Sequence, residues 1–132
     1  MSYARKMLDS PSPVTVDESM LAGVIDALSD CAQACVGDAD SDLSEHNVTE
    51  MVTCIRLCLN CADICTTAAA VISRQAGYDA SVTKPLLEAC TAICKTCGDE
   101  CERHAEMHAH CRVCGEACRR CEQACRELLR AL

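Results

Sequence analysis

Large aromatic side chains are almost absent from this sequence of 132 residues. It contains no Phe, no Trp and only two Tyr, Tyr3 and Tyr78. Half of its residues are hydrophobic when its 15 cysteines are counted, but without them the share falls to about 39%, which is low for a globular chain. Because protein interiors are close-packed, cysteine, or something bound to cysteine, must fill much of the central volume.

Positive charge is also scarce. Twelve Lys and Arg stand against 20 Asp and Glu, which gives a net charge of −8. Nucleic acids and anionic membranes attract basic patches, so neither is expected as a partner. The longest apolar run is far too short to span a membrane, and the N-terminus has neither the apolar core of a secretory signal nor a twin arginine. These absences predict a cytoplasmic protein.

Strand signals are missing as well, because no segment alternates polar and apolar residues with a period of two. Capping and turn residues instead divide the chain into helices. Thr15 or Asp17 is expected to cap the first long helix, Gly37 to end it, and GDADSD at 37–42 to form a polar turn. Four long helices are predicted, at about 17–36, 43–76, 81–104 and 107–132.

Four helices with short links predict an all-α fold, an antiparallel up-down-up-down four-helix bundle. A short extra helix is expected near the N-terminus, followed by an extended linker over DSPSPVTVDES. The chain therefore divides into an N-terminal segment and linker at 1–16 and a four-helix bundle domain at 17–132.

The cysteines follow a helical rhythm. In CIRLCLNCADIC, at 54–65, they are separated by steps of four, three and four, which places them on one helix face within about 60° of arc. The spacing recurs along the chain, and an internal repeat of this kind indicates architecture. All fifteen cysteines belong to such stripes: Cys31, Cys35, Cys54, Cys58, Cys61, Cys65, Cys90, Cys94, Cys97, Cys101, Cys111, Cys114, Cys118, Cys121 and Cys125.

Antiparallel pairing of the last two helices would bring their stripes together rung by rung. Residues at equal height then have a nearly constant index sum, which only an inward-facing arrangement explains. The sequence therefore predicts a cysteine-lined core with these facing pairs: Cys101 with Cys111, Cys97 with Cys114, Cys94 with Cys118, and Cys90 with Cys121.

The two ends of the bundle are expected to differ. At one end the stripes lead to Asp38 and to a group of soft or borderline metal ligands, His104, Met107, His108 and His110, whereas His46 lies off its stripe. The opposite end is predicted to be sealed by apolar side chains: Met20, Leu21, Val24, Ile72, Val82, Leu86, Leu87, Leu128 and Leu129.

Soft thiolates at this density indicate metal ligands in a reducing compartment rather than disulfides. Thiolates select Cu(I), Zn(II) or iron–sulfur clusters. Zinc prefers pairs of cysteines on turns, four ligands to an ion, and ferredoxin clusters use compact loops. Cysteines on continuous helices favour Cu(I), because bridging thiolates can hold about one ion per cysteine, or on the order of fifteen.

Two other functions stay open at this point. One is a zinc or iron–sulfur binding module. The other is a thiol redox protein, although a redox C-x-x-C normally begins a helix beside a strand, and here the motif lies within helices. No catalytic Ser/His/Asp or paired-carboxylate site accompanies it, so the protein is not expected to be an enzyme.

The repeated C-x3-C-x2-C-x3-C stripes and the turn ERHAEMHAHC resemble those of the bacterial cytosolic copper storage proteins, over roughly residues 17–132. The resemblance implies a bundle that stores multiple Cu(I) ions, usually as a homotetramer, and takes up copper at the His/Met end. A copper chaperone is an expected carrier. The first helix departs from the pattern, since it offers only two cysteines and Val24 and Leu28 continue its stripe.

Overall fold

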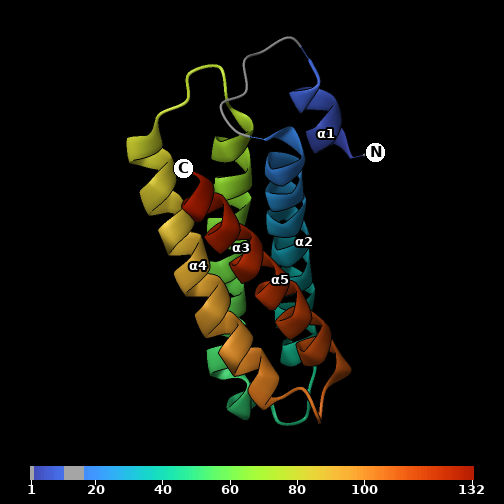
Figure 1. Ribbon diagram of the computed structural model, residues 1–132. Helices are drawn as coiled ribbons and strands as arrows, with labels where there is room; N and C mark the ends of the chain where they lie inside the picture. The colour runs from blue at the N-terminus through green and yellow to red at the C-terminus, as the bar shows by residue number, and fades with distance from the viewer. Residues whose placement is uncertain (1, 11–16) are drawn as a thin grey trace.

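The computed structural model of the chain describes residues 2–10 and 17–132. A short helix precedes four long ones, which run alternately up and down (Figure 1). No strand occurs within these two ranges, and the predicted all-α four-helix bundle is confirmed. The elements are α1 (Tyr3–Leu8), α2 (Glu18–Leu43), the 3-10 turn η1 (Val48–Glu50), α3 (Val52–Ser73), α4 (Ala80–Arg103) and α5 (Ala109–Ala131).

Each long helix packs against two others, so that the four enclose a central axis. α2 lies against α3 and α5, and α4 lies against the same two helices. Short connections between antiparallel neighbours explain this arrangement. The links from α2 to α3 and from α4 to α5 are at the same end of the bundle (Figure 1).

The start of α2 is where the sequence places it. Asp17 is the N-cap, and its side chain accepts a hydrogen bond of 2.8 Å from the backbone N–H of Met20. This bond satisfies one of the N–H groups that a helix start leaves unpaired. Thr15, the alternative cap, and most of the expected linker lie outside the described residues.

The end of α2 differs from the prediction. The helix does not stop at Gly37 but continues through GDADSD to Leu43. Asp38, Ala39 and Asp42 are buried, because they extend the inward face that Cys31 and Cys35 begin. A helical glycine costs only about 1 kcal/mol, which a buried face can offset. The next long helix consequently begins at Val52, after a turn and η1, rather than near residue 43.

The end of the bundle near the chain termini is apolar. Leu21, Val24, Ile72, Leu87 and Leu128 are buried there as predicted. Val82 is an exception: it lies in the first turn of α4 with 54% of its surface exposed, because it faces away from the axis.

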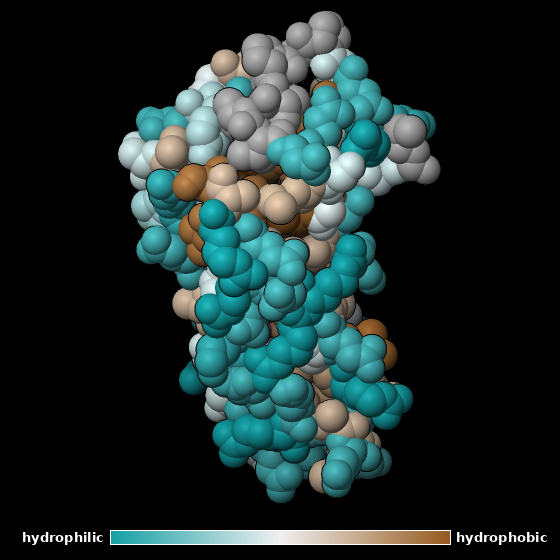
Figure 2. Space-filling view, viewed as in Figure 1, coloured by the Kyte–Doolittle hydropathy of each residue, from teal (hydrophilic) through white to brown (hydrophobic). Residues whose placement is uncertain are grey.

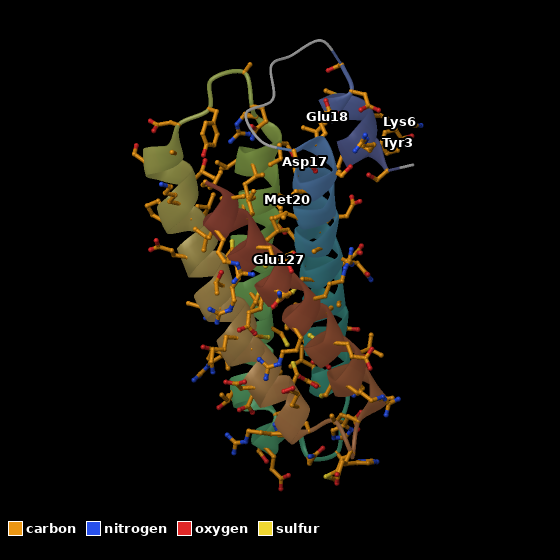
Figure 3. The ribbon with its side chains drawn as sticks, viewed as in Figure 1. Tyr3, Lys6, Asp17, Glu18, Met20 and Glu127 are labelled. Atoms are coloured by element: carbon orange, nitrogen blue, oxygen red, sulfur yellow. The ribbon has the colours of Figure 1, made fainter. Side chains whose placement is uncertain are left out.

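The helix α1 covers part of this apolar end. Its Leu8 is buried in the core, and Arg5 pairs with Glu18 at the start of α2. Figure 3 shows Tyr3 and Lys6 on the outer side of α1, whereas Met20 of α2 points toward the bundle. The short N-terminal helix expected from the sequence therefore packs beside the start of the first long helix.

The outer face of α4 and α5 is strongly polar, and Figure 2 shows hydrophilic residues over most of it. Arg119 of α5 pairs with Asp99 and Glu102 of α4, and also with Glu122. The Glu102 and Asp99 carboxylates raise the pKa of this guanidinium. Gly98 leaves room for the pairing, since a Cβ there would lie 3.1 Å from the guanidinium. This network joins the two helices on their solvent side.

The helices α2 and α3 are more apolar, and both are long and apolar enough to cross a membrane by length and composition alone. A core helix of a soluble bundle passes the same test, and half of the relevant stretch of α2 and a third of that of α3 are buried inside the molecule. This property reflects a stretch of each helix with small side chains and few charges, and it carries no membrane assignment.

Candidate metal centre

The fifteen cysteine side chains face one another along the bundle axis, and we call the row that they form the channel. All are buried, with at most 1% of any of them exposed, and none forms a disulfide. The sulfur atoms lie 3.5 Å apart for Cys35 and Cys114, 3.7 Å for Cys31 and Cys61, and 4.0 Å for Cys65 and Cys121. Two sulfurs at such separations can both reach one metal ion, because a metal–thiolate bond is about 2.3 Å long.

Thiols from different helices form layers across the channel. At least three groups of four thiols have all their sulfur atoms within 4.8 Å of one another. Two of the groups take one cysteine from each of the four helices. The groups are Cys31, Cys65, Cys94 and Cys121; Cys35, Cys58, Cys97 and Cys114; and Cys31, Cys35, Cys61 and Cys118.

The layers differ in part from the facing pairs of cysteines that the index sum predicts for α4 and α5. Cys97 and Cys114 share a layer as predicted, but Cys94 shares one with Cys121 instead of Cys118. The sulfur of Cys118 lies 3.8 Å from Cys31 and 3.9 Å from Cys35 of α2. The constant-sum rule treats α4 and α5 as an isolated pair, whereas the stripe of α5 also faces α2.

Two carboxylates lie at the channel mouth, the end where α2 meets the turn before α5. Asp38 is buried, and its Oδ2 is 3.5 Å from the sulfurs of Cys58 and Cys101. Asp42 is 0% exposed, and its Oδ1 is 3.5 Å from the sulfur of Cys111. Asp38 was predicted on the cysteine stripe, whereas Asp42 was not predicted as a residue of the site. Asp42 follows Asp38 by four residues, which is the spacing of one helix face, but the predicted turn at 37–42 excluded a helical reading of that spacing.

His110 links these carboxylates to the surface. Its Nδ1 lies 2.5 Å from Oδ1 of Asp38, and its Nε2 lies 2.9 Å from Oε1 of Glu45. When the imidazole is protonated, both ring nitrogens donate to these carboxylates, because a carboxylate is an acceptor. Burial lowers the pKa of His110, but the hydrogen bonds to Asp38 and Glu45 outweigh burial and leave this pKa raised.

The electrostatics of the mouth oppose extra negative charge. Burial raises the pKa of Asp42, and burial together with the charges of Asp38 and Asp42 raises the pKa of the Cys111 thiol. A positive ion between these groups would stabilise their charged forms, because an opposite charge nearby favours ionisation.

The three other residues expected at this end take different positions. The rings of His108 and His110 stack with centroids 5.1 Å apart. Nδ1 of His108 is 3.5 Å from Glu45, and its Nε2 is buried with no hydrogen-bond partner in the described part of the chain. His104, the residue that follows α4, instead forms a hydrogen bond of 2.8 Å with Glu100 of that helix.

Met107 is not brought together with the histidines. Its side chain is 74% exposed in the turn between α4 and α5. His46 is exposed, in agreement with its place off the stripe. His108 and His110 thus lie together at the mouth. His104 is bound to Glu100, and Met107 is exposed in the turn, which we call the rim.

The four-helix fold and the row of buried thiols along its axis define a class of protein: a helical bundle that can bind metal ions along its core. The family described as copper storage protein (Csp) matches residues 17–130, and the chain belongs to this family. The family predicted from the sequence is thereby confirmed.

Solved structures agree with this assignment. The copper storage protein Ccsp from Streptomyces lividans, loaded with 10 copper equivalents, is 52% identical, with a TM-score of 0.95 over 98% of this chain and 99% of that chain. The Cu(I)-bound copper storage protein BsCsp3 is 34% identical, with a TM-score of 0.71 over 80% of this chain and 94% of that chain. The cysteine-rich protein YhjQ of Bacillus subtilis (strain 168) is 38% identical over 104 residues, which are 79% of this chain and 91% of YhjQ.

Proposed function

We propose that this protein stores multiple Cu(I) ions in the cytoplasm, bound by thiolates along the axis of its bundle, and that it is not an enzyme. The observation that carries the proposal is the set of fifteen buried thiols, most of which have another sulfur within 3.5–4.0 Å. Membership of the copper storage protein family and the copper-loaded relatives support it.

The arrangement of the thiols favours Cu(I) over the alternatives. Cys31 and Cys35 each belong to two layers, so one thiol faces more than one group of neighbours. Bridging of this kind suits Cu(I), which accepts two or three soft ligands, and not isolated zinc sites with four ligands of their own. A dithiol redox site needs exposed, reactive thiols, whereas these are enclosed. Neither alternative is favoured.

Anaerobic titration of the copper-free protein with Cu(I) tests storage directly. We expect uptake of on the order of fifteen ions per chain, with thiolate-to-copper charge-transfer absorbance rising at each addition. A parallel titration with Zn²⁺ serves as the control and should saturate at about three or four ions. Saturation of Cu(I) at four ions or fewer would contradict storage and favour a discrete metal site.

The ligands of the stored copper are proposed to be the fifteen cysteines, with His104, Met107, His108 and His110 acting at the entrance. Met107 has an exposed thioether at the rim, where a carrier such as a copper chaperone can reach it. His108 offers a buried ring nitrogen without a partner further in. Copper would pass from these weaker ligands to the thiols below, while the apolar end excludes a bare cation.

The protein is further proposed to be a homotetramer, as the family resemblance implies. Four exposed apolar residues lie on or beside α2 and α3: Val36, Leu43, Val52 and Leu59. A groove of 680 Å³ between these helices is lined mainly by small side chains, including Ala32, Gly37 and Ala69. Small residues allow close approach of a second copy, and exposed apolar patches mark interaction surfaces.

Light scattering after size-exclusion chromatography tests the tetramer. We expect a mass of four times 14.2 kDa for the unmodified chain. The double substitution Val36→Glu and Leu59→Glu should reduce it to a single chain, because it buries charge in the proposed interface. Val113→Glu, an equally exposed position on α5, is the control and should leave the tetramer intact. A monomeric unmodified chain would remove the tetramer from the proposal.

A further inference from the structure

We propose that Arg119 of α5 is a positioning residue for copper storage. It clamps α5 to α4 from the solvent side and thereby fixes the distance between the thiols of Cys97 and Cys114 inside the bundle. In this role Arg119 binds no copper and acts through the two helices that carry the thiols. The inference rests on the proposed storage of Cu(I) and adds to it a residue outside the row of thiols.

Arg119 uses its whole guanidinium group to hold α4. Its Nη2 donates to Asp99 and to Glu102, each at 2.5 Å, and its Nε lies 3.1 Å from the other oxygen of Glu102. Its Nη1 donates to the carbonyl oxygen of Lys95 at 3.4 Å and to Glu122 of its own helix at 3.2 Å. A single exposed ion pair contributes little, whereas a network with a forked arginine–carboxylate pair holds a defined geometry.

Glycine allows the two helices to approach closely at this clamp. Gly98 of α4 lies beside the guanidinium, and a Cβ there would be 3.1 Å from Nη1 of Arg119. Gly115 of α5 faces the same stretch of α4, where a Cβ would be 3.5 Å from the Cβ of Cys101 and 3.6 Å from Cγ of Glu102. The contact between α4 and α5 is therefore tight, and Arg119 covers it from outside.

The clamp lies beside one layer of thiols. Gly98 directly follows Cys97, and Gly115 directly follows Cys114, and the sulfurs of these two cysteines are within 4.8 Å of each other. Two thiolates can share one ion only while their sulfurs are within about 4.6 Å, twice a metal–sulfur bond of about 2.3 Å. Moving α5 away from α4 by about 1 Å would therefore separate the pair too far to share an ion.

The other helix contacts are held differently. Below the mouth, where His110 joins α2 and α5, these two helices share the single exposed ion pair of Arg120 with Asp30, at 2.7 Å. Within the described ranges, the two charged residues of α3, Arg56 and Asp63, form no ion pair with a neighbouring helix. The separation of α4 and α5 is thus the one that an arginine network fixes from the solvent side.

Competition with a Cu(I) chelator, bathocuproine disulfonate, tests the clamp on the anaerobically loaded full chain. We expect Arg119→Met to take up the same number of ions as the unmodified chain when no chelator is present. It should release about four of them at a roughly tenfold lower chelator concentration, because groups that orient metal ligands from outside affect affinity on this scale. Arg120→Met, the neighbouring arginine, is the control and should retain copper as the unmodified chain does.

Removing the thiols that the clamp positions separates a local effect from a general loss of stability. In the background Cys97→Ser and Cys114→Ser, Arg119→Met should cause no further loss of retention, because the coupled groups are gone. In the background Cys90→Ser and Cys125→Ser, on the same two helices but nearer the apolar end, the tenfold effect should persist. A merely structural role would produce the same loss in both backgrounds.

Gly98→Ala tests the clamp without removing its charge. Alanine favours the helix, but its Cβ at 3.1 Å displaces the guanidinium, so retention should fall as in Arg119→Met. Combining the two substitutions should add nothing further. Gly37→Ala is the control, because α2 is helical there and no atom lies within 4 Å of the added Cβ. Circular dichroism of the copper-free variants reports whether each one folds.

Two results would overturn the proposal while leaving storage intact. One is equal copper retention in Arg119→Met, Gly98→Ala and the unmodified chain. The other is an equal loss of retention from Arg119→Met in both cysteine backgrounds. Uptake of four ions or fewer by the unmodified chain would instead contradict storage and overturn this inference with it, so the two failures are distinguishable.

Discussion

Replacing Cys54, Cys58, Cys61 and Cys65 together by Ser is expected to lower the Cu(I) capacity by about four ions without unfolding the bundle. These residues form the thiol stripe of α3, and all four are fully buried. Serine has nearly the same shape as cysteine, and the apolar seal and the helix caps are unchanged. Atomic absorption of the anaerobically loaded variant gives the capacity, and circular dichroism of the copper-free variant gives the helix content.

The structure offers a matched variant with the same number of substitutions. The change of Cys31, Cys65, Cys94 and Cys121 to Ser removes one complete layer instead of one thiol from several layers. If each thiolate contributes independently, both variants lose about four ions. A capacity near zero in either variant, with the helix content preserved, would mean that copper assembles only as a cooperative cluster. Loss of helix in the copper-free variants would mean that the thiols are needed to build the channel.

The stripes of cysteine made most of the fold predictable. A 4-3-4 spacing places side chains on one helix face, and three such faces, together with the shorter pair of Cys31 and Cys35, can be buried together only by turning inward. Asp17 is a cap and Leu87 and Leu128 are core residues for equally local reasons. Periodicity therefore specified the number of long helices, the direction of their cysteine faces and the sealed end, whereas capping residues gave the start of α2 but not its end or the start of α3.

Burial overrode local signals at the end of α2. GDADSD has the composition of a turn, but Asp38 and Asp42 lie on the face that continues the cysteine stripe and remain helical. Their desolvation is offset by contacts that no local pattern reveals, such as the one between Asp38 and His110, which are 72 residues apart. The burial of the two carboxylates at the mouth therefore could not be predicted from neighbouring residues in the sequence.

The turn between α4 and α5 is the other segment whose side-chain positions could not be predicted from the sequence. Helical periodicity fixes where the cysteines point but says nothing about a segment between helices, where each side chain follows its own backbone angles. Met107 consequently faces solvent while His108, one residue later, is directed toward His110. The pairing of Cys94 with Cys121 likewise required the position of α2, which a comparison of two helices omits.

Substitution of His108 by Leu is expected to slow Cu(I) uptake about tenfold or more while leaving the final capacity nearly intact. Nε2 of His108 is buried at the mouth and has no hydrogen-bond partner among residues 2–10 and 17–132, so it is free to bind an arriving ion. His108 is a better test than His110, whose removal would also leave Asp38 without its 2.5 Å contact. Stopped-flow absorbance under anaerobic conditions measures the uptake rate.

Control variants distinguish the role of His108 at the mouth from that of Met107 in the exposed turn between α4 and α5. His46→Leu changes an exposed histidine and should leave the rate unchanged. Met107→Leu removes the thioether at the rim, so it should slow uptake from a protein carrier more than uptake of free Cu(I). The apolar end cannot serve as an alternative route, because a bare cation is strongly penalised among Leu21, Leu87 and Leu128. Equal rates for His108→Leu and His46→Leu would therefore mean that copper enters between the helices, and the histidines of the mouth would then have a structural role alone.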